Sequence, residues 1–169
     1  METVKRLEFT IYGQPVGKTN MKPIINKRTG HIQSIQTEKN SNYMARVQAA
    51  LMEQLEKQPD LDMSHNGYGY DVVIIAQYQI QKQHYHFYKR TQKTELDKTG
   101  QDKLEGIIRP TIKPDCDNIS KIICDAITHL GSVWKDDSEV STLLVQKKYG
   151  EVSKVTVIIE TKTINNLLY

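Results

Sequence analysis

The chain has 169 residues, of which 38% are hydrophobic and 25% are charged, and its formal net charge at pH 7 is +3. This length and balance predict one folded domain over residues 1–169 and exclude a disordered chain, which would have fewer apolar residues and a larger net charge. No stretch approaches the roughly 18 apolar residues of a membrane span, and the first residues lack the apolar segment of a signal peptide. We therefore expect a cytoplasmic protein with no membrane partner. Its two cysteines, Cys116 and Cys124, are interpreted as reduced thiols.

Basic residues concentrate in two segments of the chain. Residues 1–48 contain eight Lys or Arg against three Asp or Glu, and residues 81–113 contain eight against four. Local basic surface is what a polyanion requires, because neutralising phosphates releases condensed counterions. A nucleic-acid partner and an ordinary solvated surface explain the charge equally well.

The amino-terminal third predicts a strand, a basic loop and a second, shorter strand. Apolar and polar residues alternate over Leu7–Tyr12, which predicts a half-buried strand. Residues 13–31 combine Gly and Pro with four basic residues and predict a flexible basic loop. A short strand over His31–Gln36 follows.

A long helix is predicted over Thr37–Lys57, a stretch without Gly or Pro in which apolar residues recur at helical spacing. Thr37 or Ser41 supplies its N-cap. After a turn-rich connector, the β-branched and aromatic residues of Tyr70–Ile80 predict a central strand, and His84–Tyr88 is expected to extend its ladder.

The carboxyl-terminal half predicts a mobile loop, a helix and a hairpin. Residues 89–113 are polar, basic and weakly periodic, and we expect them to form a loop that faces the substrate. An apolar stripe from Ile119 to Leu130, closed by Gly131, predicts a second long helix. Residues Val140–Tyr149 and Val152–Thr161 alternate as two strands joined in a hairpin. Together these elements predict an α+β (mixed α/β) fold, a small mixed β-sheet packed by two main helices.

Two carboxylates lie where the chain enters the second helix. Pro114 disfavours helical geometry at Lys113, so Asp115 and Asp117 are expected on an extended segment, where residues i and i+2 point the same way. Two neighbouring carboxylates repel each other unless a cation lies between them, which indicates a hard ion such as Mg²⁺ or Mn²⁺. The alternative is that one of them is only the helix N-cap.

Further charged residues follow at suggestive positions. Asp136, in the sequence Trp134-Lys135-Asp136-Asp137-Ser138, could return to complete a metal clamp, although Asp-Asp-Ser is also an ordinary turn. Lys121 lies four residues after Asp117, where it forms either a simple ion pair or a cation beside a scissile phosphate. Asp125 continues the same helix face.

The ordered run KPDCDNISKIICDAITHLGSVWKDDSEV resembles the RusA family of Holliday junction resolvases, whose motif has Lys-Pro-Asp-x-Asp-Asn, a Lys-bearing helix, Asp-Ala and then Trp-x-Asp-Asp. The likeness covers about residues 113–148 and extends more loosely to the first strand and basic loop, up to Lys18. It implies that Asp115, Asp117 and Asp136 are metal-binding catalytic acids and that Lys121 is the essential basic residue. Asn118, Asp125 and Asp137 also fall on motif positions, as possible supports of the site.

The resemblance further implies a RusA-like homodimer that acts on branched DNA, uses Mg²⁺ with Mn²⁺ as a plausible substitute, and needs no small-molecule cofactor. Family members are often encoded by bacteria or their prophages. Candidate DNA contacts are the basic residues of the first loop and the one before the acids: Lys18, Lys22, Lys27, Arg28 and Lys113. The loop after Lys18 is less arginine-rich than the family pattern, and residues 89–112 are longer than a simple connection requires.

Two other functions remain open from the residues. One is a catalytically silent junction-binding module that keeps the basic surface and uses the acids structurally, and the other is a nuclease that cuts flaps or forks. His84 and His86 alternate on the predicted strand and are interpreted as surface residues of its edge rather than metal ligands. Trp134 is interpreted as an anchor of the core.

Overall fold

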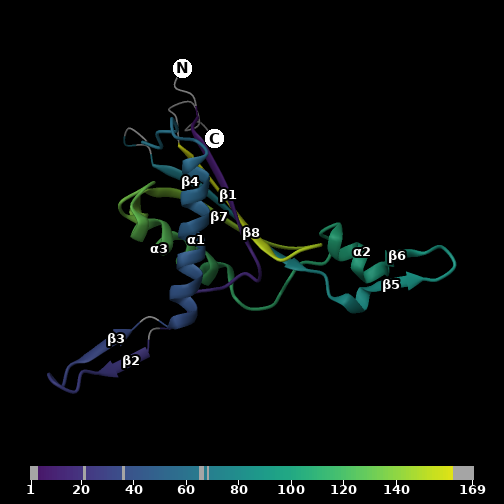
Figure 1. The fold of residues 1–169 in the computed structure, drawn as a ribbon, viewed down its shortest axis with the longest axis horizontal. Coiled ribbons are helices and arrows are strands. Elements are labelled where there is room, and N and C mark those ends of the chain that lie inside the picture. The colour runs from purple at the N-terminus through teal and green to yellow at the C-terminus, as the bar shows by residue number, and fades with distance from the viewer. Residues whose placement is uncertain (1–3, 21, 36, 65–66, 68, 162–169) are drawn as a thin grey trace.

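The computed structural model describes residues 4–20, 22–35, 37–64, 67 and 69–161. Its centre is a twisted four-stranded sheet (Figure 1). In spatial order the strands are β1 (Arg6–Tyr12), β8 (Lys154–Thr161), β4 (Tyr70–Gln79) and β7 (Val140–Gly150). β8 runs antiparallel to both of its neighbours, whereas β4 and β7 are parallel, so the sheet is mixed. The predicted α+β class is therefore confirmed.

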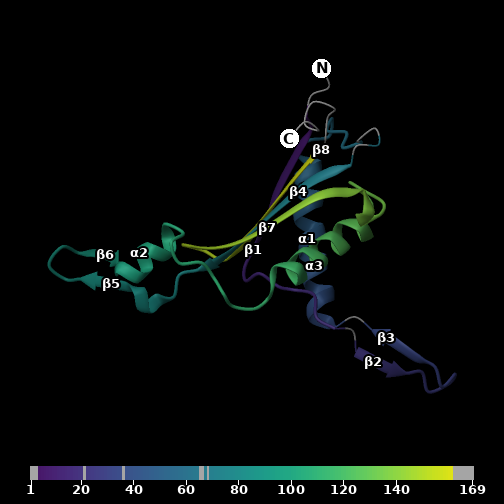
Figure 2. The ribbon, with the colours of Figure 1, turned by 180° about the vertical axis from the view of Figure 1, so that it is seen from behind.

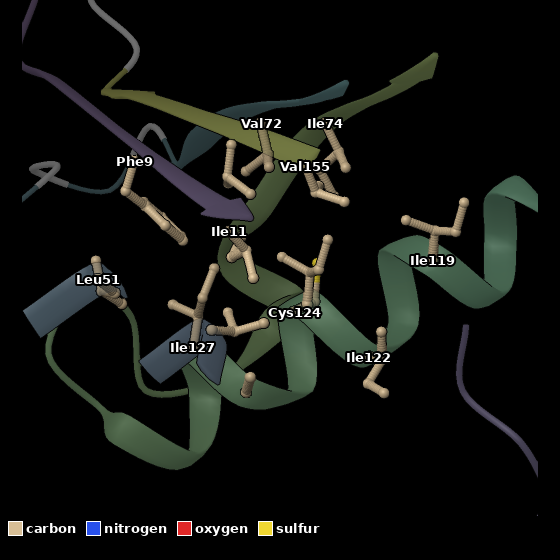
Figure 3. Packing of buried hydrophobic residues seen from close by; sticks show 14 of the residues in the cluster. Phe9, Ile11, Leu51, Val72, Ile74, Ile119, Ile122, Cys124, Ile127 and Val155 are labelled. Atoms are coloured by element: carbon tan, nitrogen blue, oxygen red, sulfur yellow. The ribbon is translucent and has the colours of Figure 1, made fainter. Parts of the chain in front are cut away.

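Two helices pack on the sheet, α1 (Glu38–Glu56) and α3 (Cys116–Leu130), as predicted. The apolar stripe of α3 packs against strand residues such as Ile11 and Val155 (Figure 3), and it is fully buried from Ile119 to Ile127, while Leu130 is partly buried. Thr37 is the N-cap of α1 and accepts a hydrogen bond from the Asn40 amide, which decides between the two predicted caps. Gly131 ends α3 in the left-handed conformation at φ 66°, where a side chain would be strained.

The predicted hairpin of the last two strands is wrong. β7 and β8 follow each other in the chain but do not pair, because β4 lies between them in the sheet. β4 alternates fully buried residues such as Val72 and Ile74 with half-buried ones such as Val73, so both of its faces carry apolar side chains. Such a strand gains most from pairing on both edges, which places it at the centre.

Two segments project from the body in different directions (Figures 1 and 2). The first is a hairpin of β2 (Lys22–Ile25) and β3 (Ile32–Ile35). Sequence reasoning predicted β3, whose expected last residue, Gln36, lies outside the described residues. It missed β2, which lies within residues 13–31 and shows that this stretch is not wholly a loop. The second segment contains η1 (Lys82–His84), β5 (Tyr85–Tyr88), β6 (Lys93–Leu96) and α2 (Lys98–Leu104).

This second segment overturns three further predictions. β5 does not extend the ladder of β4, since η1 turns the chain away and β5 pairs with β6 instead. Residues 89–113 are not one structureless loop, because they contain β6 and α2. His84 is buried rather than a surface residue of an edge strand, while His86 is exposed.

Three further predictions concern Trp134, the two cysteines and membrane-spanning helices. Trp134 is a core residue, as predicted, at 1% exposure beside Tyr70. Both cysteines are free, and burial raises the pKa of the Cys124 thiol to about 12. No helix among the described residues has the length and apolar character to span a membrane.

Candidate active site at the start of α3

The carboxylates of Asp115 and Asp117 lie at the exposed amino-terminal end of α3. The helix begins at Cys116, so the prediction that both acids share an extended segment is wrong, and only Asp115 has extended backbone angles. Asp115 occupies the N-cap position, yet its side chain makes no capping hydrogen bond. The capping alternative therefore does not account for this residue.

Lys121 lies one turn after Asp117 on the exposed side of α3. Its ammonium nitrogen is 3.3 Å from Oδ2 of Asp117, as the i,i+4 spacing predicted. The hydrogen bond from Lys121 is the main cause that holds the pKa of the Asp117 carboxyl below its usual value. Asp117 is thus ionised at neutral pH, which is the form that binds a metal ion.

Asp136 lies beyond α3, as the N-cap of η2 (Asp137–Glu139). Its Oδ1 accepts a hydrogen bond from the Ser138 amide at 2.9 Å, and hydrogen bonds from Ser138 lower the pKa of the Asp136 carboxyl. η2 contacts α3, so the chain does return toward the helix that carries the other two acids. Asp137 is exposed beside it.

The three acids do not form a preassembled metal-binding group. Among the described residues, no three His, Cys, Asp or Glu side chains lie close enough together to hold a metal ion. The chemistry of the donors nevertheless fits a hard divalent cation, which prefers carboxylate oxygens. The side chains of Asp115, Asp117 and Asp136 are all exposed and open to such an ion.

A cavity of about 440 Å³ opens beside Asp115. It lies between the start of α3 and the loop that follows β1. Its lining includes three lysines, Lys18, Lys39 and Lys113, together with Asn118. The cavity therefore combines a carboxylate with cations of the kind that contact phosphate.

The loop after β1 is held directly on α3. The Lys18 amide donates a hydrogen bond of 2.8 Å to the Asn118 carbonyl, and its ammonium group forms an ion pair with Asp125. Gly17 is required for this approach, because a Cβ at that position would lie 2.5 Å from Cβ of Pro114. Three predicted site residues, Lys18, Asn118 and Asp125, are thus brought together.

Comparison of the chain with known proteins identifies its protein family. Residues 13–160 match the family model described as "Endodeoxyribonuclease RusA". The chain belongs to the RusA family. A 63-residue part of it is also 48% identical to the uncharacterized protein YqaN of Bacillus subtilis (strain 168). That match covers 37% of this chain and 43% of YqaN, so the aligned part spans less than half of the relative.

The remaining predicted DNA contacts of this RusA family member lie on the β2–β3 hairpin. Lys27 and Arg28 are at its tip, where the Asn26 side chain accepts hydrogen bonds from the Arg28 and Thr29 amides and orders the turn. The side chain of Lys22 lies outside the described part. Placement at the tip of a projecting hairpin keeps both cations in solvent.

Sequence reasoning missed three residues that shape the RusA-type site. The side chain of Asn40, in the first turn of α1, is completely buried and hydrogen-bonds the amide, carbonyl and hydroxyl groups of Thr19. Lys147, on β7, donates to the carbonyl of Ile112 at 2.5 Å and to that of Pro114 at 3.3 Å. With Gly17, these residues position the two segments that border the cavity. No local pattern marks them, since each acts across a large sequence separation.

Proposed function

We propose that this chain is a Mg²⁺-dependent endodeoxyribonuclease that resolves Holliday junctions by paired, symmetric nicks. The observation that carries the proposal is the pair of exposed carboxylates, Asp115 and Asp117, at the start of α3 beside a cavity lined by Lys18 and Lys113. Membership of a family of endodeoxyribonucleases supports it.

Asp115, Asp117 and Asp136 would hold the divalent ion, with the third carboxylate joining when the ion binds. A carboxylate-held Mg²⁺ supplies positive charge to phosphate oxygens and makes a bound water a stronger nucleophile. Lys121 would offset the negative charge that builds on the scissile phosphate, because its ammonium group is exposed and already lies next to Asp117. Lys18 would position Asn118 and Asp125 rather than contact DNA with its ammonium group, which is paired with Asp125.

A homodimer is part of the proposal. A four-way junction is nearly two-fold symmetric, so nicking two opposed strands calls for two sites related by a two-fold axis. The sheet face opposite the helices supports such an assembly, since it carries exposed Leu144 next to half-buried Val73 and Ile75. Light scattering of the purified protein measures its mass and tests this part.

The decisive experiment compares an immobile four-way junction, a matched duplex and a flap, each with Mg²⁺ or with EDTA. Asp117→Asn is the test variant, and Asp60→Asn is the matched control because Asp60 is exposed on the connector between α1 and β4. We expect symmetric nicks in the junction alone, lost with EDTA and in Asp117→Asn but retained in Asp60→Asn. Equal cutting of flap or duplex would contradict junction selectivity.

A second function, a silent junction-binding module, is favoured by one observation. The described residues contain no preassembled group of three metal-binding side chains. This function predicts that the unmodified chain binds the junction with and without Mg²⁺ and never nicks it. The same experiment therefore separates the two functions.

A further inference from the structure

The projecting segment of η1, β5, β6 and α2, here called the arm, carries a cluster of aromatic and basic side chains at its far end. Phe87 is 57% exposed and Tyr88 is 51% exposed, although aromatic side chains are usually largely buried. The turn between β5 and β6 adds exposed cations. The arm tip is defined as Phe87, Tyr88, Lys89, Arg90 and Lys93.

The cations of the arm tip have no acidic partners in the part of the chain that the structure describes. Lys89, Arg90 and Lys93 form no ion pair with any of the described residues, whereas Lys98, on α2 of the same arm, is paired with Asp102 at 2.6 Å. Three unpaired positive charges on a narrow ribbon match a polyanion better than an apolar protein surface.

The two aromatic rings lie on opposite faces of the β5–β6 ribbon. Directly paired residues of antiparallel strands share a face, and Phe87 pairs with Thr94 while Tyr88 pairs with Lys93. Each face of the ribbon thus offers one ring, with a cation directly beside Tyr88. Rings interleaved with cations are typical of surfaces on which unpaired bases stack while lysines and arginines contact the backbone.

The base of the arm is held together by a network of polar contacts. His84 lies at its centre, buried at 8% exposure, with Nδ1 3.1 Å from Oδ2 of Asp97 and Nε2 2.8 Å from the Lys103 ammonium nitrogen. Lys103 also donates to Gln81 at 2.7 Å and lies 5.0 Å from the ring centre of Tyr149, on β7. This network joins η1, α2 and the main sheet, so the base of the arm is anchored to the body.

The arm is also directly connected to the proposed active site. Residues 105–115 lead from the end of α2 to Asp115, and Lys147 on β7 holds this connection through the Ile112 and Pro114 carbonyls. The hydrogen bonds from Lys147 would therefore also fix DNA bound along the arm relative to Asp115 and Asp117.

We propose that the arm tip binds unpaired DNA at the branch, with its two rings stacked on bases and its three cations on phosphates. Duplex is the poorer ligand, because its base faces are covered by their neighbours, whereas the strands at a branch interrupt the stack. The inference rests on the proposed function in that it names the form of DNA that the nuclease recognises beyond its active site.

Binding is measured by fluorescence anisotropy in EDTA, with the full chain and three labelled probes: an oligothymidylate, an immobile four-way junction and a blunt duplex. The test variant Phe87→Ala/Tyr88→Ala is expected to lose about tenfold or more in affinity for the oligothymidylate, to bind the junction more weakly, and to bind duplex as the unmodified chain does. Tyr88→Phe keeps a stacking ring and is expected to retain the affinity. Tyr12→Ala is the matched control, since Tyr12 is 69% exposed at the end of β1.

A second variant tests the cations. Replacing Lys89, Arg90 and Lys93 by Gln is expected to reduce the slope of log affinity for the oligothymidylate against log salt by about 2, because each phosphate contact to a single strand contributes about 0.7. Thermal melts verify that each variant is folded, and the exposed positions of all five residues predict unchanged midpoints.

The outcomes separate this inference from the proposed function. If the unmodified chain nicks the junction but both arm variants bind all three probes as it does, the inference is wrong and the proposed function stands. If the unmodified chain binds no DNA, both are wrong. If the aromatic variant instead changes the mass measured by light scattering, the arm tip is a contact between copies of the chain and not a DNA-binding element.

Discussion

Replacing Asn40 by Ala tests how the loop after β1 is held against the site. The Asn40 side chain is fully buried and makes three hydrogen bonds to Thr19, two of 3.1 Å and one of 3.3 Å. At about 1 kcal/mol net for each, their loss costs about 3 kcal/mol. Ala has a higher helix propensity than Asn, which adds about 0.6 kcal/mol to the stability of the first turn of α1. We therefore expect a net destabilisation of about 2 to 2.5 kcal/mol.

The assay combines stability and activity. For a chain of this size, the expected loss corresponds to a fall in melting temperature of about 5–10 °C. Because Thr19 and Asn20 line the cavity beside Asp115, junction cleavage at a temperature where the variant is folded is also expected to slow. Ser41→Ala is the matched control, as Ser41 lies in the next helical position, is exposed, and donates its hydroxyl hydrogen bond to the Thr37 carbonyl. It is expected to change stability by less than about 0.5 kcal/mol.

One result would refute this reasoning. If Asn40→Ala and Ser41→Ala have the same melting temperature, the hydrogen bonds to Thr19 contribute nothing net and the loop is held by other contacts. If Asn40→Ala is destabilised as expected but cleaves at the normal rate, the loop is held by Asn40 but does not shape the site.

Three further predictions concern the core, the loop and the acids. Trp134→Ala should cost about 3–5 kcal/mol in urea denaturation, because the ring is fully buried; a cost near zero would show that it is not a core anchor. Gly17→Ala places a Cβ 2.5 Å from Cβ of Pro114, so it should cost about 1–3 kcal/mol and slow cleavage, and an unchanged rate would mean that the close approach is dispensable. In Lys121→Ala, the pKa of the Asp117 carboxyl should rise toward its ordinary value, because the hydrogen bond that lowers it is lost. The lowered pKa stabilises the fold at pH values above the unfolded-state pKa, and this contribution is lost as the pH falls through the folded-state pKa. NMR titration of the metal-free variant measures the pKa of Asp117 directly, and an unchanged pKa would show that Lys121 does not lower it.

The arrangement of the acids was predictable in part. The spacing of Asp117 and Lys121 on one helix face follows from the helical repeat alone, and the structure shows the expected contact. The geometry of Asp115 and Asp117 was predicted wrongly, because the helix begins at Cys116 and therefore already includes Asp117. Gly17, Asn40 and Lys147 were invisible, since their roles depend on segments far away in the chain.

Local patterns in the sequence determined the elements whose signals lie within a few residues. The apolar stripe of α3 and its closure at Gly131, the helical stretch of α1 and the alternation of β1 all follow from short-range periodicity and capping, although the structure was needed to choose Thr37 over Ser41 as the cap of α1. The motif from residue 113 to 148 likewise determined the family, which the match over residues 13–160 confirmed.

Only the tertiary structure decided which strands pair and which segments leave the body. β7 and β8 have the pattern of a hairpin, yet β4 separates them, because a strand with apolar side chains on both faces is stabilised by two neighbours. The arm is polar and weakly periodic in sequence, and it is held by His84, Asp97 and Lys103, whose hydrogen bonds exist only once the chain has folded. Strand partners and buried polar networks are long-range properties, and the free energy that selects them comes from surfaces that meet only in the folded protein.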